Sequence, residues 1–195
     1  MQAQKLWSSR KGSTAAKFGR DVVREALKRG VQQPAVVFDM DETLMFNRDK
    51  YDEDIKIAVN PHMKELYDWL VSRGVTVFVV TARRRNDWSY NLIHKQLRGL
   101  GYHNIKGVYM VPKSYDADPS ASRFKLDARR RIMSMGYKIL LNVGDQASDH
   151  MLVPPYHAAN GDFAARLDKN KYYGIKSDDG SSLMSIKLKN TYVVS

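Results

Sequence analysis

The chain has 195 residues and a formal net charge of +11, with 43% hydrophobic and 27% charged residues. This length suits one globular domain with a substantial core, and no apolar window approaches the ~20 residues that span a bilayer. The absence of cysteine excludes a disulfide framework, a thiol nucleophile and a cysteine metal site. The N-terminal segment lacks the apolar centre of a secretory signal. We therefore expect a cytoplasmic protein without a membrane segment, and the oligomeric state stays open.

The first thirty residues form a basic arm, with eight Lys and Arg against Asp21 and Glu25. Within it, residues 15–29 predict a leading helix. Its apolar face is formed by Phe18, Val22, Ala26 and Leu27. A second basic stretch, residues 123–138, holds six cations against one Asp. Basic surfaces attract phosphate esters and nucleic acid. Either is therefore an expected partner, and a solvated surface that promotes solubility is the alternative for the arm.

A helix-like segment, a glycine and an apolar run recur four times along the chain. The glycines stand where left-handed helix C-caps are expected, at Gly30, Gly74, Gly101 and Gly136. The runs that follow them are AVVFD, VTVFVVT, IKGVYMV and YKILLNVG. They lack alternation, as strands covered on both faces do. The pattern predicts an α/β fold, a doubly wound, Rossmann-like parallel sheet sandwiched by helices.

The segments between these units are short. Residues 45–60 are polar and irregular and predict a flap-like excursion, Pro61 suits the first turn of a helix, and residues 112–122 predict a loop. The stretches YYGI and SIKLKNTYVV predict two late strands. No linker or large cap domain is evident. We therefore expect residues 1–195 to form a single domain.

Polar side chains follow three of the four apolar runs. The first run ends in Asp39, Asp41 and Glu42, the second ends in Thr81, Ala82 and Arg83, of which Thr81 and Arg83 are polar, and the fourth leads to Asp145 and Asp149. Ligands of open parallel sheets bind beyond the carboxyl ends of the strands. A single Asp there is explained by helix N-capping. Several carboxylates at one edge instead favour a hard cation with oxygen ligands, and therefore predict a Mg²⁺ site.

These motifs identify a family resemblance. The runs DMDET from Asp39, the strand-ending Thr81, Lys125 and GDQASD from Gly144 resemble, in order, the signature of the haloacid dehalogenase (HAD) superfamily of phosphatases. More narrowly, SRFKLDARRRI followed by GYKILLNVGDQASD resembles the class B-like acid phosphatases of plants and bacteria. The stretch IKLKNTYVV resembles their closing strand, with Lys189 where proline is usual. The resemblance covers roughly residues 33–193.

The resemblance implies a role for each matched residue. Asp39 would be the nucleophile that forms an aspartyl-phosphate, and Asp41 the general acid and base. Thr81 and the backbone at Ala82 would bind the phosphoryl group, and Lys125 would neutralise its charge. Mg²⁺ would be held by the side chains of Asp39 and Asp145 and by the backbone carbonyl of Asp41. The carboxylate of Asp149 would support these ligands.

Three further cations near the motifs have open roles. Lys113, just past the third apolar run, is an alternative to Lys125, although the match to the family helix favours Lys125. Arg83 follows the strand-end Thr81 and is interpreted either as a substrate contact or as a surface residue. Arg129 matches a basic position of the family helix and is interpreted as structural.

The motifs predict a Mg²⁺-dependent phosphomonoesterase that acts through an aspartyl-phosphate on a nucleotide or small phosphomonoester. The basic arm suggests an alternative, a polynucleotide end phosphatase. From another class comes a non-catalytic storage or nucleic-acid-binding protein on the same fold, because fold alone does not determine function. Trp88 and Tyr90 could stack on a base, and helix packing is the favoured reading for both.

Overall fold

The structure is a computed structural model that describes residues 10–47, 57–113, 115, 121–146, 149, 172–176 and 182–187. Its elements, in chain order, are α2 (Arg10–Lys28), β1 (Pro34–Phe38), β2 (Met45–Asn47), β3 (Ile57–Val59), α3 (Pro61–Ser72), β4 (Thr76–Arg84), α4 (Asp87–Gly99), β5 (Ile105–Val111), α5 (Ser122–Ser134), β6 (Lys138–Gly144), β7 (Tyr172–Lys176) and β8 (Ser182–Lys187). Some of the sequence predictions fall on residues outside these ranges. They concern residues 1–9 of the basic arm, 48–56 of the flap-like segment, 114 and 116–120 of the predicted loop, and 188–194 of the stretch SIKLKNTYVV, which include Lys189.

Six strands form the main sheet, in the order β5-β4-β1-β6-β8-β7. Neighbouring strands are parallel except β7, which runs antiparallel to β8 at the edge. From β1 the chain moves outward through β4 to β5 and then crosses to β6 on the other side of β1. The order therefore reverses at β1, and such a reversal opens a ligand crevice at the carboxyl ends of the strands. The predicted doubly wound α/β sheet is confirmed, β7 covers the predicted late strand YYGI, and β8 overlaps only the first three residues of SIKLKNTYVV.

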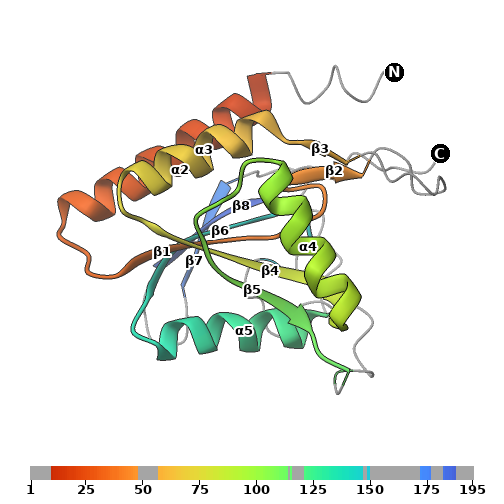
Figure 1. Cartoon of the computed structure of the whole chain (residues 1–195). Helices are drawn as coiled ribbons and strands as arrows, with labels where there is room; N and C mark the ends of the chain where they lie inside the picture. The colour runs from red at the N-terminus through yellow and green to blue at the C-terminus, as the bar shows by residue number, and fades with distance from the viewer. Residues whose placement is uncertain are drawn as a thin grey trace, which may run out of the picture.

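Both faces of the sheet are covered by helices (Figure 1). Val36 and Phe38 of β1 belong to a buried cluster that includes residues of α2, α3 and α4. Ala35 and Val37 of the same strand belong to a second cluster, which includes residues of α5. Successive side chains of a strand point to opposite faces. Because both faces are buried, the strand sequences are continuously apolar, as the sequence predicted.

Helix ends follow the predicted signals. The backbone φ angle is positive at all four predicted cap glycines, with values of 72°, 70°, 84° and 92° in chain order. At Gly101 a Cβ atom would also lie 2.9 Å from Cε of Lys64, so the end of that side chain would have to move. Helix α3 begins with Pro61, and the side chain of Asn60 caps it by accepting from the backbone N–H of Met63. These caps set where each strand starts and therefore where it delivers its last residue.

The leading helix α2 is longer than predicted and packs on α3, where Arg20 donates to Glu65 at 2.7 Å. Its buried face differs by one position from the prediction, because Val23 is fully buried whereas Val22 is only partly buried. Ala16 and Ala26, which lie before and after Val23 along α2, are also buried, so the face that includes Val23 packs against the core. The predicted flap begins and ends as an antiparallel pair, β2 and β3.

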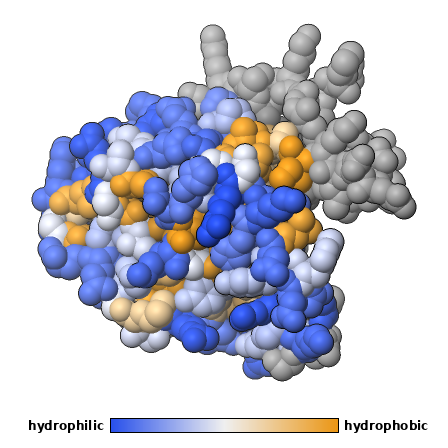
Figure 2. Space-filling view, viewed as in Figure 1, coloured by the Kyte–Doolittle hydropathy of each residue, from blue (hydrophilic) through white to orange (hydrophobic). Residues whose placement is uncertain are grey.

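Hydrophilic side chains cover most of the face that Figure 2 shows. On α2, the exposed cations are partly compensated, since Lys17 and Arg24 both contact Asp21, at 3.0 Å and 2.6 Å. Exposed pairs of this kind contribute little to stability. Among the described residues, no helix combines the length and the apolar character needed to cross a bilayer.

Candidate active site

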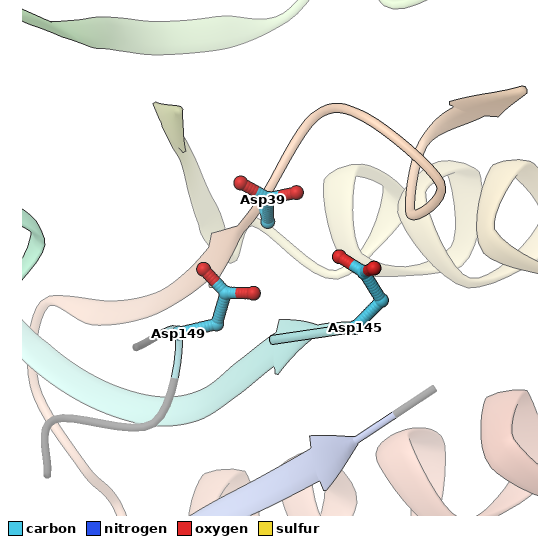
Figure 3. A group of neighbouring side chains, drawn as sticks. All are labelled: Asp39, Asp145 and Asp149. Atoms are coloured by element: carbon cyan, nitrogen blue, oxygen red, sulfur yellow. The ribbon is translucent and has the colours of Figure 1, made fainter. Parts of the chain in front are cut away.

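Three aspartates meet at the carboxyl edge of the sheet (Figure 3). Asp39 follows β1, Asp145 follows β6, and Asp149 lies in the turn after it. Each offers a carboxylate oxygen within 4.8 Å of the others, and all three side chains are buried. The carboxylates surround a common space in Figure 3. We call these three residues the aspartate cluster. The structure thus brings together Asp39 and Asp145, as expected, and Asp149 lies beside them rather than behind them.

A lysine of helix α5 also contacts this cluster. Lys125 of α5 donates to Oδ1 of Asp39 at 2.9 Å and to Oδ1 of Asp149 at 2.6 Å. Its side chain is only 3% exposed. Lys113, the alternative from the sequence, is exposed after the end of β5. Of these two lysines, only Lys125 contacts the cluster.

Arg129 and Asn142 support the position of Lys125. The fully buried Arg129 donates from Nη1 to the backbone carbonyl of Lys125 at 2.9 Å, and from Nε to Oδ1 of Asn142 at 2.8 Å. Asn142 belongs to β6, so these contacts tie one turn of α5 to the strand that ends at the cluster. None of the sequence motifs predicts a role for Asn142. Its signal is an amide inside the apolar run KILLNVG.

The cluster carries more negative charge than its neighbours compensate. Burial raises the pKa of Asp39 well above its usual range, and repulsion from Asp149 adds to this, although Lys125 opposes it. Burial, followed by repulsion from Asp149, raises the pKa of Asp145 to about 6. Burial lowers the pKa of Lys125, but attraction to Asp149 and Asp39 outweighs it and keeps that pKa above its usual value. Lys125 and the buried guanidinium of Arg129 supply two positive charges against three buried carboxylates, which leaves room for a further cation.

The aspartate cluster fits a divalent metal ion. Its donors are carboxylate oxygens, which Mg²⁺ prefers, and ligands on opposite sides of that ion lie about 4.2 Å apart. The spacing in the cluster is of the same order. Gly144 is part of the fit, because a Cβ atom there would lie 2.2 Å from Oδ2 of Asp149. Without a side chain at position 144, the carboxylate of Asp149 can pack directly against the end of β6.

The turn after β6 holds two of the carboxylates in place. The backbone N–H of Gln146 donates to Oδ2 of Asp149 at 3.0 Å, and Nε2 of Gln146 donates to Oδ2 of Asp145 at 2.9 Å. The backbone N–H of Asp149 in turn donates to the carbonyl of Gln146 at 3.1 Å. The geometry of the cluster is therefore set locally on this side by the contacts of Gln146 with Asp145 and Asp149.

Asp41 lies outside the aspartate cluster and pairs with Arg83. Nε of Arg83 donates to Oδ2 of Asp41 at 2.9 Å, and Nη2 donates to Oδ1 at 2.6 Å. Thr81, two residues before Arg83 in β4, is buried. Its Oγ1 accepts from the backbone N–H of Arg83 at 3.2 Å. Its hydroxyl proton remains for another acceptor. Ala82, whose backbone was expected to contact phosphate, is exposed.

The parallel sheet and its aspartates at the carboxyl edge define the HAD-like class of α/β proteins. The class C acid phosphatase from Bacillus anthracis has a similar fold, with a TM-score of 0.52 and 18% identity, over 75% of this chain and 68% of that one. A structure of that enzyme with tungstate bound matches with a TM-score of 0.56 and 16% identity, over 81% and 75% of the two chains.

Residues 49–192 match the model of the HAD superfamily, subfamily IIIB (acid phosphatase), and the chain belongs to this family. The match includes Thr81, Lys125, Asp145 and Asp149, whereas Asp39 precedes it. The stem 28 kDa glycoprotein of Glycine max is 28% identical over 107 residues, which are 53% of this chain and 41% of that protein. The chain thus spans less than half the length of this curated relative.

Proposed function

We propose that the protein is a Mg²⁺-dependent phosphomonoesterase that works through an aspartyl-phosphate. The observation that carries the proposal is the buried aspartate cluster with Lys125 across it, at the carboxyl edge of the sheet of an acid phosphatase family member. Buried carboxylates with an incomplete set of cations are suited to a substrate site that a metal ion and a phosphate group complete.

In the first step, an oxygen of Asp39 attacks phosphorus and forms the aspartyl-phosphate. The bond from phosphorus to the ester oxygen breaks, and its electron pair goes to the leaving oxygen. Asp41 gives its proton to that oxygen, which leaves as an alcohol. Lys125 contacts Asp39 already in the structure and stabilises charge on the phosphoryl oxygens.

In the second step, water attacks the phosphorus of the aspartyl-phosphate and loses a proton to Asp41. The bond between phosphorus and Asp39 breaks, which regenerates the carboxylate and releases inorganic phosphate. The hydroxyl of Thr81 and the backbone N–H of Ala82 donate to phosphoryl oxygens through both steps. In support of this role, both groups belong to β4 just beyond Val79, the last residue of that strand that pairs with β1.

The side chains of Asp39 and Asp145 and the carbonyl of Asp41 would hold Mg²⁺, with Asp149 and Lys125 beside them. The ion when bound supplies charge neutralisation and an oriented phosphate. The chain itself keeps Asp39 and Asp145 buried and poor in positive charge, which favours uptake of a cation.

The test is a screen of the full chain over sugar phosphates, nucleotides and p-nitrophenyl phosphate, with Mg²⁺ and with EDTA. We expect hydrolysis that EDTA abolishes and that added Mg²⁺ restores. Absence of hydrolysis for every ester in the presence of Mg²⁺ would refute the proposed activity. Equal rates with EDTA would refute the metal requirement.

Binding of Mg²⁺ should weaken as the pH falls. The pKa of Asp145 is about 6, that of Asp39 is also raised, and a metal ion binds the deprotonated carboxylates. Between pH 7.5 and pH 5.5, protonation of Asp145 alone predicts about a fourfold loss of affinity. Isothermal titration with Mg²⁺, in two buffers of different ionisation enthalpy, measures both the affinity and the protons released. An affinity that is the same at both pH values would contradict the prediction.

A second candidate function is that of a polynucleotide end phosphatase, which one observation favours. Trp88, at the start of α4, is 72% exposed, and Tyr90 is 38% exposed, so helix packing does not account for Trp88. The guanidinium of Arg85 lies 5.2 Å from the ring centroid of Tyr90. Exposed aromatic rings beside cations suit a single strand with stacked bases.

This second candidate predicts faster hydrolysis of a 3′-phosphorylated oligonucleotide than of a mononucleotide, with a steep loss on adding salt. Trp88→Ala should reduce the preference for the oligonucleotide and leave hydrolysis of p-nitrophenyl phosphate unchanged. Equal rates on both nucleotide substrates would remove this candidate. Tight oligonucleotide binding without hydrolysis of any ester would instead favour the non-catalytic, nucleic-acid-binding alternative.

A further inference from the structure

The carboxylate of Asp41 is held by a forked contact from a neighbouring strand. Two donors of Arg83, Nε and Nη2, each reach a different oxygen of Asp41, at 2.9 Å and 2.6 Å. A bidentate guanidinium–carboxylate pair restricts the rotation of the carboxylate as well as its position. Both residues are only partly exposed, so solvent screens this pair less than a surface ion pair.

The guanidinium of Arg83 is itself anchored. Its third nitrogen, Nη1, donates to Oε1 of Gln96 at 2.8 Å. Gln96 belongs to α4, whose first turn is fixed by the capping box between Asn86 and Ser89. The backbone N–H of Arg85 also donates to the carbonyl of Val111 at the end of β5. The guanidinium of Arg83 is therefore held by β4 and by α4, independently of β1.

We infer that Arg83, anchored by Gln96, is the positioning residue of Asp41 in the proton transfer. The inference rests on the proposed function, in which Asp41 gives a proton to the leaving oxygen and later takes one from water. When Asp41 carries the proton, the protonated oxygen gives up its hydrogen bond from Arg83 and donates to the leaving oxygen instead, without rotation of the carboxyl group. The other oxygen stays held by Arg83. Once the proton has moved, the carboxylate again accepts both hydrogen bonds.

This role has a signature that depends on the leaving group. An alkoxide is strongly basic and needs the proton of Asp41 as it departs, whereas p-nitrophenolate is weakly basic and departs without it. Loss of Arg83 should therefore slow the cleavage of alkyl phosphates far more than that of p-nitrophenyl phosphate. If Arg83 instead bound the phosphate group directly, both esters would be affected equally, because they share that group.

The experiment compares kcat/KM for glycerol phosphate and p-nitrophenyl phosphate in the full chain with Mg²⁺. This parameter reports formation of the aspartyl-phosphate and excludes its hydrolysis, in which Asp41 acts as a base. We expect Arg83→Met to lower the value for glycerol phosphate about 10- to 100-fold and that for p-nitrophenyl phosphate less than about fivefold. Arg83→Lys, which keeps the charge without the fork, should recover only part of the loss. Arg98→Met, on the exposed side of α4, serves as the charge-matched control and should change neither value.

Two further variants keep the test decisive if Arg83→Met does not fold. Gln96→Leu removes only the hydrogen bond that anchors Arg83. It should lower kcat/KM for glycerol phosphate about threefold more than kcat/KM for p-nitrophenyl phosphate. In an Asp41→Asn background, Arg83→Lys should lower kcat/KM for either ester by less than a further factor of about two. The reason is that the side chain that Arg83 positions no longer transfers a proton.

The outcomes separate this inference from the proposed function. Equal losses on both esters, or full additivity with Asp41→Asn, would overturn the positioning role while the phosphatase activity stands. No turnover of either ester by the unaltered chain would refute the proposed function, and the positioning role with it.

Discussion

Replacing Asp39 by asparagine should abolish turnover of p-nitrophenyl phosphate in the presence of Mg²⁺. The side chain keeps its shape, but an amide oxygen does not attack phosphorus, so the aspartyl-phosphate does not form. The change also removes one negative charge from the aspartate cluster and weakens the contact with Lys125. We expect kcat/KM to fall on the order of 10³-fold or more, as for other nucleophile replacements.

Steady-state kinetics measure this loss, and mass spectrometry after acid quench detects the covalent phosphoryl group in the unaltered chain only. Asp21→Asn, on the exposed face of α2, removes the same charge at a distance and should keep full activity. Turnover that persists in Asp39→Asn with a properly folded chain would mean that another group attacks phosphorus.

Replacing Lys125 by methionine should damage both stability and catalysis. Methionine fills a similar volume, but Asp39 and Asp149 lose the ammonium group that bridges them, and all three side chains are buried. Removal of one partner from a buried ion pair costs about 3–5 kcal/mol of the free energy of unfolding. Loss of the charge facing the phosphoryl group should lower kcat about 10²- to 10³-fold.

The stability loss should depend on pH in a defined direction. The pKa of Asp39 in the fold already lies above its usual value, and without Lys125 it rises further. The folded chain then binds more protons than the unfolded chain, so its stability falls as the pH rises. Urea unfolding at pH 5 and pH 8 measures this difference, and added Mg²⁺ should offset part of it at pH 8.

Lys113→Met is the matched control, since Lys113 is exposed and was the alternative in the sequence. It should leave the free energy of unfolding within about 0.5 kcal/mol. A larger effect of Lys113→Met than of Lys125→Met, on stability or on kcat, would reverse the assignment of the phosphate-binding lysine.

Much of the fold was predictable because local signals agreed with the global pattern. Cap glycines such as Gly74, followed by unbroken apolar runs, predicted strands buried on both faces, and the structure has them. The exact buried face of α2 was not predictable, because a shift from Val22 to Val23 depends on how α2 lies against α3. The antiparallel direction of β7 likewise depends on its pairing with β8.

The sequence by itself determined which chemical groups stand near the carboxyl ends of three strands, among them Asp39, Thr81 and Asp145, although β4 runs three residues past Thr81 to Arg84. Strand order and the common direction of parallel strands then require these groups to meet at one edge. Only the tertiary structure decided which partners they meet. The contacts of Lys125 with Asp39 and of Arg83 with Asp41 join residues 86 and 42 positions apart. Such contacts depend on distances of a few ångströms between elements that share no local pattern, and no spacing along the chain encodes them.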